Sequence, residues 1–322
     1  MKPAVERMGH PGWCVNLVQA AALQPGESVL VVVDEPLLEQ GSQLVATVAD
    51  AGGRPRLEVW SGDRPMEHAP TAVLDAADRA DVCYFVHQDA LAAEAGARFE
   101  LMQRLTGHGG REIFMGFVDA ELLAGELSRP APDLVEPAER LLDEVSGADR
   151  MHLTSPGGTD LTLRVGGRPW RDDVHALQPG TMANFPGGEI YVAPHRDGAD
   201  GVLVADLTVP YTVDGLVDEP VVIRFERGRI TAIEGGRAAD MLRTIVEEAG
   251  PGGDVVAELG IGLNHTIVPR GHVLLDEKAG GTAHVAIGRN TGHYGGDNEA
   301  SIHIDCIFAS PRITADGRLV TP

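Results

Sequence analysis

The sequence predicts an α/β protein in two parts: an N-terminal domain with a doubly wound parallel sheet and a C-terminal, β-rich α+β domain. Three observations support this fold class. Strand and helix patterns alternate through the first part of the chain, strands and glycines dominate the second, and a Pro-rich bend with an acidic helix separates them near 126–147. The length of 322 residues allows two domains, which we expect at 1–147 and 148–322.

In the N-terminal part, short apolar runs typical of buried strands are separated by segments with helical spacing of their apolar residues. Strands that alternate with helices of about 10 to 15 residues indicate a parallel sheet. No GxGxxG motif follows the first strand, so we expect no dinucleotide cofactor. The expected strands are 28–34, 56–60, 81–86 and 112–117, and the expected helices are 17–24, 37–52, 69–80 and 91–105.

The C-terminal part reads mainly as strands joined by glycine-rich turns. The segment MHLTSPGGTDLTLRVGGRPW (151–170) predicts a hairpin with its turn at PGGTD and a second turn at Gly166 and Gly167. One helix, RAADMLRTIVEEAG, interrupts the strands and ends at Gly250. Further strands are expected within 202–209, 221–235 and 284–290.

Composition restricts the partners. The formal net charge of −22 argues against nucleic acid or an anionic membrane surface. The longest apolar runs are strand-sized, and MKPAVERMGHPGW lacks the basic and apolar regions of a signal peptide. Three cysteines without CxxC spacing fit a reducing compartment. We therefore expect a cytoplasmic protein that binds neither nucleic acid nor a membrane.

The most informative segment runs from Glu258 to Asp305. In SIHIDCIF, the period-2 alternation of a strand puts His303 and Asp305 on one face and the apolar residues beside them on the other. An imidazole and a carboxylate on one strand face present ligand atoms to the same point. Zinc, manganese, cobalt and ferrous iron all accept this combination. The pattern predicts a metalloenzyme.

Two more candidates lie on expected strands upstream. Glu258 stands between apolar neighbours in VVAELGIGLN, a poor position for a solvated carboxylate. His284 shares a strand face with Ala286 and Gly288, small residues that leave room beside an imidazole. Each residue alone has an ordinary structural explanation, but together with the His-x-Asp pair they are hard to bury unless a cation pairs them.

Two glutamates follow the same logic. Glu277, in LLDEKAGGTAH, is expected to point inward while its neighbours Asp276 and Lys278 face solvent, because strand neighbours point in opposite directions. Glu189 follows a Pro-Gly-Gly turn in NFPGGEIYVAP, which presents its carboxylate at the start of a strand.

These motifs resemble a known family. NFPGGEIYVAP, AELGIG, LLDEKAGGTAHVAIG and GGDNEASIHID, in this order, are similar to the metal-binding signatures of the aminopeptidase T (thermophilic aminopeptidase) family of two-metal exopeptidases. GTDLTLRVGGRPW also resembles the hairpin that precedes the first signature, so the resemblance covers roughly residues 150–310. It implies a metallo-aminopeptidase, a protease that cleaves N-terminal residues from peptides or small amides through a water bridging two metals. It also implies a homodimer.

Carried over by position, the resemblance implies six metal ligands, with Glu258 as the bridge between two ions. Four carboxylates and two neutral imidazoles carry four negative charges, which two divalent cations neutralise. One cation would leave two negative charges and raise the pKa of a carboxyl group. The ligands implied are Glu189, Glu258, Glu277, His284, His303 and Asp305.

The catalytic residues are less well defined by the resemblance. Relatives in that family carry a tyrosine seven residues after the histidine of the DEK motif, where this chain has Thr291. Tyr294 or His293 from the same loop is the candidate substitute, and Arg289 is a further candidate near the ligands. Glu277 can act either as a ligand or as the general base.

Two alternatives stay open. A 2,5-dihydroxypyridine dioxygenase resembles the same family but has a histidine at the ELGIG position and binds one ferrous ion through two histidines and one carboxylate. Here that position is Glu258, which favours two metals, although the nearby His265 supports the alternative. The second is a non-catalytic metal-binding protein, suggested by Thr291. Zinc, cobalt or manganese fits the hydrolase, and iron fits the dioxygenase.

Overall fold

A computed structural model describes residues 9–174 and 177–321 of the chain. Residues 1–8, which form most of the segment compared with a signal peptide, lie outside the described residues. The chain divides into two compact units, of which unit 1 is Met1–Pro132 with His175–Pro186 and unit 2 is Asp133–Val174 with Gly187–Pro322. The expected domain boundary at residue 147 stays a prediction, since compactness alone does not make a segment fold independently.

Unit 1 is built on a five-stranded sheet, sheet A, with the order β2-β1-β3-β4-β8. All neighbouring strands of sheet A are parallel. The strands are β1 (Ser28–Val33), β2 (Arg54–Val59), β3 (Val82–Val86), β4 (Arg111–Met115) and β8 (Met182–Asn184). The helices are α1 (Gly12–Ala20), α2 (Leu38–Asp50), α3 (Thr71–Ala77), α4 (Ala95–Thr106) and α5 (Ala120–Ala124).

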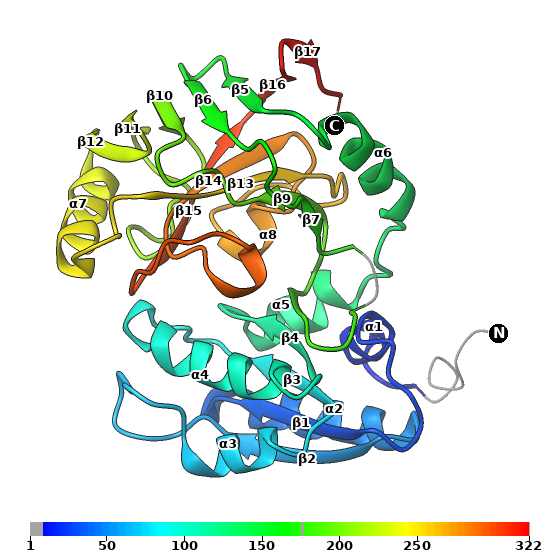
Figure 1. Cartoon of the computed structure of the whole chain (residues 1–322). Helices are drawn as coiled ribbons and strands as arrows, with labels where there is room; N and C mark the ends of the chain where they lie inside the picture. The colour runs from blue at the N-terminus through cyan, green and yellow to red at the C-terminus, as the bar shows by residue number, and fades with distance from the viewer. Residues whose placement is uncertain (1–8, 175–176, 322) are drawn as a thin grey trace. The chain divides into compact units, whose positions relative to one another are not determined.

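The strand order makes sheet A doubly wound, as predicted. Because β1 lies between β2 and β3, the right-handed connections place helices on both faces (Figure 1). Leu30 and Val32 of β1 pack in one core with residues of α3 and α4. Val33 points to the opposite face, where Gly41 of α2 approaches it closely. The three-residue strand β8 was not expected from the sequence, because such a short edge strand leaves no clear alternation.

Unit 2 contains two antiparallel sheets. Sheet B has the order β12-β11-β10-β6-β5-β16-β17, and sheet C has the order β15-β14-β13-β9-β7. The strands of sheet B are β5 (Arg150–Thr154), β6 (Asp160–Arg164), β10 (Ala199–Ala205), β11 (Val221–Glu226), β12 (Arg229–Glu234), β16 (Arg312–Ala315) and β17 (Arg318–Leu319). Those of sheet C are β7 (Arg171–Asp172), β9 (Glu189–Val192), β13 (Val256–Gly262), β14 (Thr282–Gly288) and β15 (His303–Ala309).

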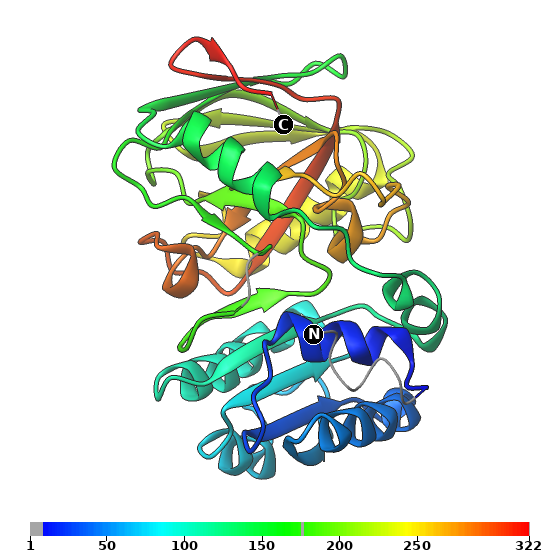
Figure 2. The same cartoon turned by 90° about the vertical axis from the view of Figure 1, so that its right-hand side faces the viewer.

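Apolar side chains from both sheets form one core in unit 2. Ile304 and Cys306 of β15 are fully buried in it together with Leu161 and Leu203 of sheet B. Helices α6 (Val135–Val145) and α7 (Arg237–Ala249) flank the sheets (Figure 1), and β15 runs through the middle of the unit (Figure 2). The predicted hairpin is confirmed by the antiparallel pairing of β5 with β6. Both the parallel sheet and the β-rich second part agree with the predicted fold class.

Among the described residues, the helices are all too short or too polar to span a membrane.

Candidate metal centre

One face of sheet C carries the candidate ligands. Directly opposite residues on antiparallel strands point to the same face. Glu258 of β13 lies opposite Ala286 of β14, which lies opposite Asp305 of β15. Two residues further along β13, Gly260 lies opposite His284 of β14. The alternation predicted for His303 and Asp305 is therefore observed, with Ile304 buried on the core face.

Gly260 makes room for His284. A Cβ atom at position 260 would lie 2.0 Å from Cε1 and 2.3 Å from Nε2 of the His284 ring. No side chain can tolerate such distances, so the imidazole lies across the glycine backbone. The ring is 1 % exposed, and its Nδ1 atom is buried without a hydrogen-bond partner. The other ring nitrogen, Nε2, lies 3.5 Å from Glu258 Oε1 and 3.6 Å from Glu189 Oε2, so Nε2 is the nitrogen available to a metal.

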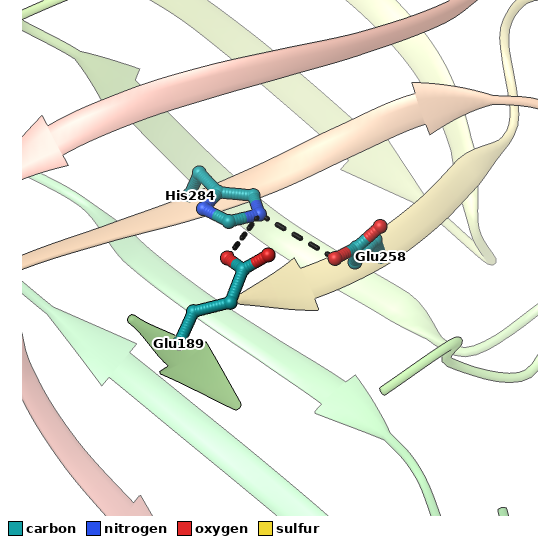
Figure 3. Close-up of side chains that lie close together, drawn as sticks. All are labelled: Glu189, Glu258 and His284. Carbon is teal, nitrogen blue, oxygen red and sulfur yellow. Dashed lines mark ion pairs between the residues drawn. The ribbon is translucent and has the colours of Figure 1, made fainter. Parts of the chain in front are cut away.

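Five of the six predicted ligands form two groups that share Glu258. Within each group, one ligand atom from every residue lies within 4.8 Å of the others. One group combines Glu258 with Glu189 and His284, contributed by three neighbouring strands (Figure 3). The other combines Glu258 with His303 and Asp305. Carboxylate and imidazole ligands in this number fit divalent metals, and the shared Glu258 suits a bridge between two ions.

The distances show how tightly the second group is assembled. His303 Nε2 lies 3.3 Å from Glu258 Oε2 and 3.3 Å from Asp305 Oδ1. On the other side of the ring, His303 Nδ1 lies 2.6 Å from the backbone oxygen of Arg289. A carbonyl can only accept, so Nδ1 donates and Nε2 is the nitrogen available to a metal. The contribution of Arg289 that the structure shows is thus a backbone contact that orients a candidate ligand.

The charges of the site are strongly coupled. Burial by itself lowers the pKa of His284, but Glu189, Glu258 and Asp305 around it raise that pKa to about 10. Burial also lowers the pKa of His303, which Asp305 and Glu258 nevertheless hold well above its ordinary value. Without a metal, protons on the imidazoles therefore neutralise part of the carboxylate charge at neutral pH.

The sequence did not predict that two further residues, Lys278 and Asp173, belong to the site. The Lys278 side chain is fully buried, and its Nζ pairs with Glu189, with Asp173 Oδ2 at 2.9 Å and with Glu277 Oε1 at 3.0 Å. Asp173 Oδ1 also accepts hydrogen bonds from the backbone nitrogens of Gly188 (2.7 Å) and Glu189 (2.9 Å). Asp173 and Lys278 therefore hold Glu189 in place from both its backbone and its carboxylate.

The expectation that Asp276 and Lys278 face solvent is wrong, since both are 0 % exposed. The segment is not a strand but the short helix α8 (Val273–Asp276), so neighbouring residues do not alternate between two faces. Asp276 Oδ2 accepts hydrogen bonds from Thr208 Oγ1 (2.7 Å) and from the backbone nitrogen of Gly271 (2.6 Å). Asp276 is thus a structural residue that fixes the start of the helix.

Glu277, the sixth predicted ligand, belongs to neither group. It is 5 % exposed, and burial raises the pKa of its carboxyl group, against the opposing effect of Lys278. A carboxyl group that is poised to gain a proton near a metal site suits a general base better than it suits a ligand. Both roles stay predictions.

The loop after β14 brings Tyr294 to the centre. The Tyr294 ring stacks on His303 with centroids 4.5 Å apart and meets Tyr191 edge-on at 6.1 Å. His293 packs against the same tyrosine ring, with centroids 3.9 Å apart. Tyr294 therefore lies beside a candidate ligand, and His293 lies beside Tyr294. His265, in contrast, is exposed, and its ring packs on Gly280 outside both ligand groups.

The comparisons with known proteins identify the family. The NicX family model, described as 2,5-dihydroxypyridine 5,6-dioxygenase, matches residues 14–322. The chain belongs to this family. A solved structure of 2,5-dihydroxypyridine dioxygenase from Pseudomonas putida KT2440 has the same fold, with a TM-score of 0.76 at 19 % identity over 96 % of this chain and 94 % of that one.

The relatives of this chain include enzymes with two different chemistries. Aminopeptidase T from Thermus thermophilus is 28 % identical over 52 % of this chain and 44 % of its own length. The 2,5-dihydroxypyridine 5,6-dioxygenase of Pseudomonas putida is 31 % identical over 42 % of this chain and 38 % of its own length. The chain thus spans less than half of these curated relatives. The predicted resemblance to aminopeptidase T is confirmed, and a structure of the Thermus thermophilus enzyme shares the fold with a TM-score of 0.68 at 16 % identity over 99 % of this chain and all of that one.

Gly260→Ala tests the packing of the ligand face. The added methyl group displaces the His284 ring, so we expect metal affinity to fall about 10- to 100-fold, as when the support of a ligand is lost. The matched control is Gly96→Ala in α4, where a Cβ would meet nothing within 4 Å. Metal content per chain after dialysis measures the effect. Unchanged metal content in Gly260→Ala would contradict the expectation that the position of the His284 ring controls metal affinity.

The raised histidine pKa values predict proton release on metal binding. At pH 7 the imidazoles of His284 and His303 are protonated without metal, and a metal requires their neutral form. Titration calorimetry measures this release when metal is added in buffers of different ionisation enthalpy. We expect the heat of metal binding to depend on the buffer, with a slope that corresponds to more than one proton released per chain. Metal affinity should also rise from pH 6 towards pH 10. A heat independent of the buffer is the contrary result.

Proposed function

We propose that this protein is a two-metal hydrolase that removes N-terminal residues from short peptides or cleaves small amides. The observation that carries the proposal is the position of Glu258, whose carboxylate is common to both ligand groups. A carboxylate within reach of both groups could be shared by two closely spaced divalent ions and would offset part of their mutual repulsion. Two such ions, when bound, supply Lewis acidity and lower the pKa of an attacking water.

The local charge supports two ions. Glu189, Glu258, Glu277, Asp305 and Asp173 supply five carboxylates, and the buried ammonium of Lys278 is paired with three of them. The five carboxylates and the ammonium together carry four net negative charges when the imidazoles are neutral. Two divalent cations neutralise this charge, whereas one leaves half of it in a buried site.

The surrounding residues have separable roles in this proposal. Glu277, held by Lys278, accepts the proton of the attacking water and passes it to the leaving amine. Tyr294, which lies against His303, is placed to donate a hydrogen bond to the oxygen that gains negative charge. Burial and the carboxylates of Glu258 and Asp305 raise its pKa, so the phenol keeps the proton that it must donate.

The second candidate is a mononuclear iron ring-cleaving dioxygenase. The family model over residues 14–322 favours it. Iron oxygenases of this kind use two histidines and one carboxylate. Asp305 Oδ1 lies 3.7 Å from His284 Nε2 and 3.3 Å from His303 Nε2, so such a set meets here too. The additional carboxylates of Glu258 and Glu189 beside the same imidazoles favour two ions instead. Because the relatives include both chemistries, metal content and activity must distinguish them.

Metal content per chain separates the two candidates. We expect close to two equivalents of zinc, manganese or cobalt in protein purified without chelator or nickel affinity, together with hydrolysis of aminoacyl anilides or dipeptides. About one equivalent of iron, with oxygen consumption on 2,5-dihydroxypyridine, would overturn the hydrolase in favour of the dioxygenase. Two metals with neither activity indicates a non-catalytic metal-binding protein.

Two substitutions distinguish a residue that binds the metal from one that acts as the general base. Glu258→Ala removes the carboxylate common to both groups, so we expect loss of metal and of turnover together. Glu277→Gln keeps the shape of the side chain, so we expect metal content to persist while kcat falls about 10²- to 10⁴-fold, as for other general bases. Elemental analysis and steady-state rates on the same preparations measure both. Metal loss in Glu277→Gln would instead assign Glu277 as a ligand. The expected cytoplasmic location and homodimer stay predictions.

A further inference from the structure

The ligand face of sheet C continues to an arginine at the sheet edge. Arg171 of β7 lies directly opposite Tyr191 of β9, which is paired with Gly260 and through it with His284. Opposite residues share a face, so the Arg171 side chain belongs to the same surface as the ligands. β7 is two strand spacings, about 10 Å, from the strand that carries Glu258.

Arg171 lacks the carboxylate partner that its neighbours have. Arg168 pairs with Asp297 at 3.1 Å and Arg289 with Glu299 at 2.6 Å. None of the ion pairs found among the described residues includes Arg171, and its Nε atom is buried without a hydrogen-bond partner. The chain carries 48 acidic and 26 basic residues, so an arginine without a partner is not explained by a shortage of acids. A buried guanidinium donor without an acceptor is costly unless a ligand supplies one.

Further polar atoms without partners lie in the loop beside Arg171. A Cβ atom at Gly295 would lie 3.6 Å from Nη2 and 3.8 Å from Nε of Arg171, so the guanidinium packs against this loop. In the same loop, Thr291 Oγ1 and His293 Nδ1 are both buried without a hydrogen-bond partner. A hydroxyl, an imidazole nitrogen and a guanidinium can all donate hydrogen bonds to an anion. Arginine matches the planar geometry of a carboxylate in particular.

We propose that Arg171, with Thr291 and His293, binds a carboxylate group of the substrate. The substrate is then a small molecule with a free carboxylate close to the reacting bond. In a dipeptide the carboxylate follows the scissile bond by one residue, about 3.5 Å of chain, and the long arginine side chain spans most of the remaining distance to β7. The peptide form of this substrate rests on the proposed hydrolase function, whereas carboxylate recognition does not.

Matched ligand pairs test the proposal by binding rather than by turnover. The full chain, loaded with its metal, is titrated by calorimetry with Leu-Gly and with its C-terminal amide, and separately with benzoate and benzamide. We expect at least one of the two carboxylates to bind about tenfold or more tightly than its amide. Arg171→Gln should bring that ratio close to one without changing metal content, and Arg171→Lys should keep part of it.

The control is Arg164→Gln, because Arg164 is an exposed arginine of sheet B that pairs with Asp197. We expect this variant to keep the full preference for the carboxylate. Equal affinity of carboxylate and amide in the wild type, absence of binding by both carboxylates, or a preference that survives Arg171→Gln would each overturn the proposal. If benzoate binds more tightly than benzamide but Leu-Gly binds no more tightly than its amide, the carboxylate site is upheld and the peptide hydrolase is disfavoured. Failure of the carboxylate site can therefore be told apart from failure of the proposed hydrolase function.

Discussion

The repulsion among buried carboxylates is the constraint on which this site depends. Glu189, Glu258 and Glu277 are each no more than 5 % exposed, and removing an unpaired carboxylate from water costs several kcal/mol. Lys278 neutralises only part of this charge. Protons on the imidazoles neutralise more in the absence of metal, so a cation that enters the site must displace them. Metal binding and the stability of unit 2 are therefore linked, because the ion binds the folded ligand face and not the unfolded chain.

The same strands supply the ligand face and the core. Alternation along β15 gives His303 and Asp305 to the site and Ile304 and Cys306 to the core of unit 2. A register shift of one residue would exchange the two faces and bury the ligands against apolar side chains. Burial of the core thus fixes the register, and the register fixes which ligand atoms meet. Small residues such as Gly260 are needed because an imidazole must lie flat on a neighbouring strand.

Patterns within short stretches of sequence predicted the features that depend on a single strand or on the order of strands and helices. The His303 and Asp305 face followed from strand alternation, and the parallel sheet from alternating strands and helices. Lys278 was wrongly expected to face solvent because strand alternation was applied to its segment. That segment follows a short helix, which Asp276 stabilises by accepting hydrogen bonds from backbone nitrogens, and these contacts cannot be read from the sequence. Asp173 and Arg171 were missed because neither lies in an apolar-flanked pattern. Their importance comes from strand pairing between segments far apart in the chain, which spacing alone does not reveal.

The position of Glu258 explains how one scaffold can serve two chemistries. Both ligand groups contain this residue, and the other members of each group are distinct. A histidine in its place would remove one negative charge and the only carboxylate that the two groups have in common. What would remain near His303 and Asp305 is two imidazoles and one carboxylate, a set that suits a single ferrous ion. On the proposed function, the number of metals, and with it the reaction, therefore depends mainly on one side chain in the central strand of sheet C, while the fold around it stays the same.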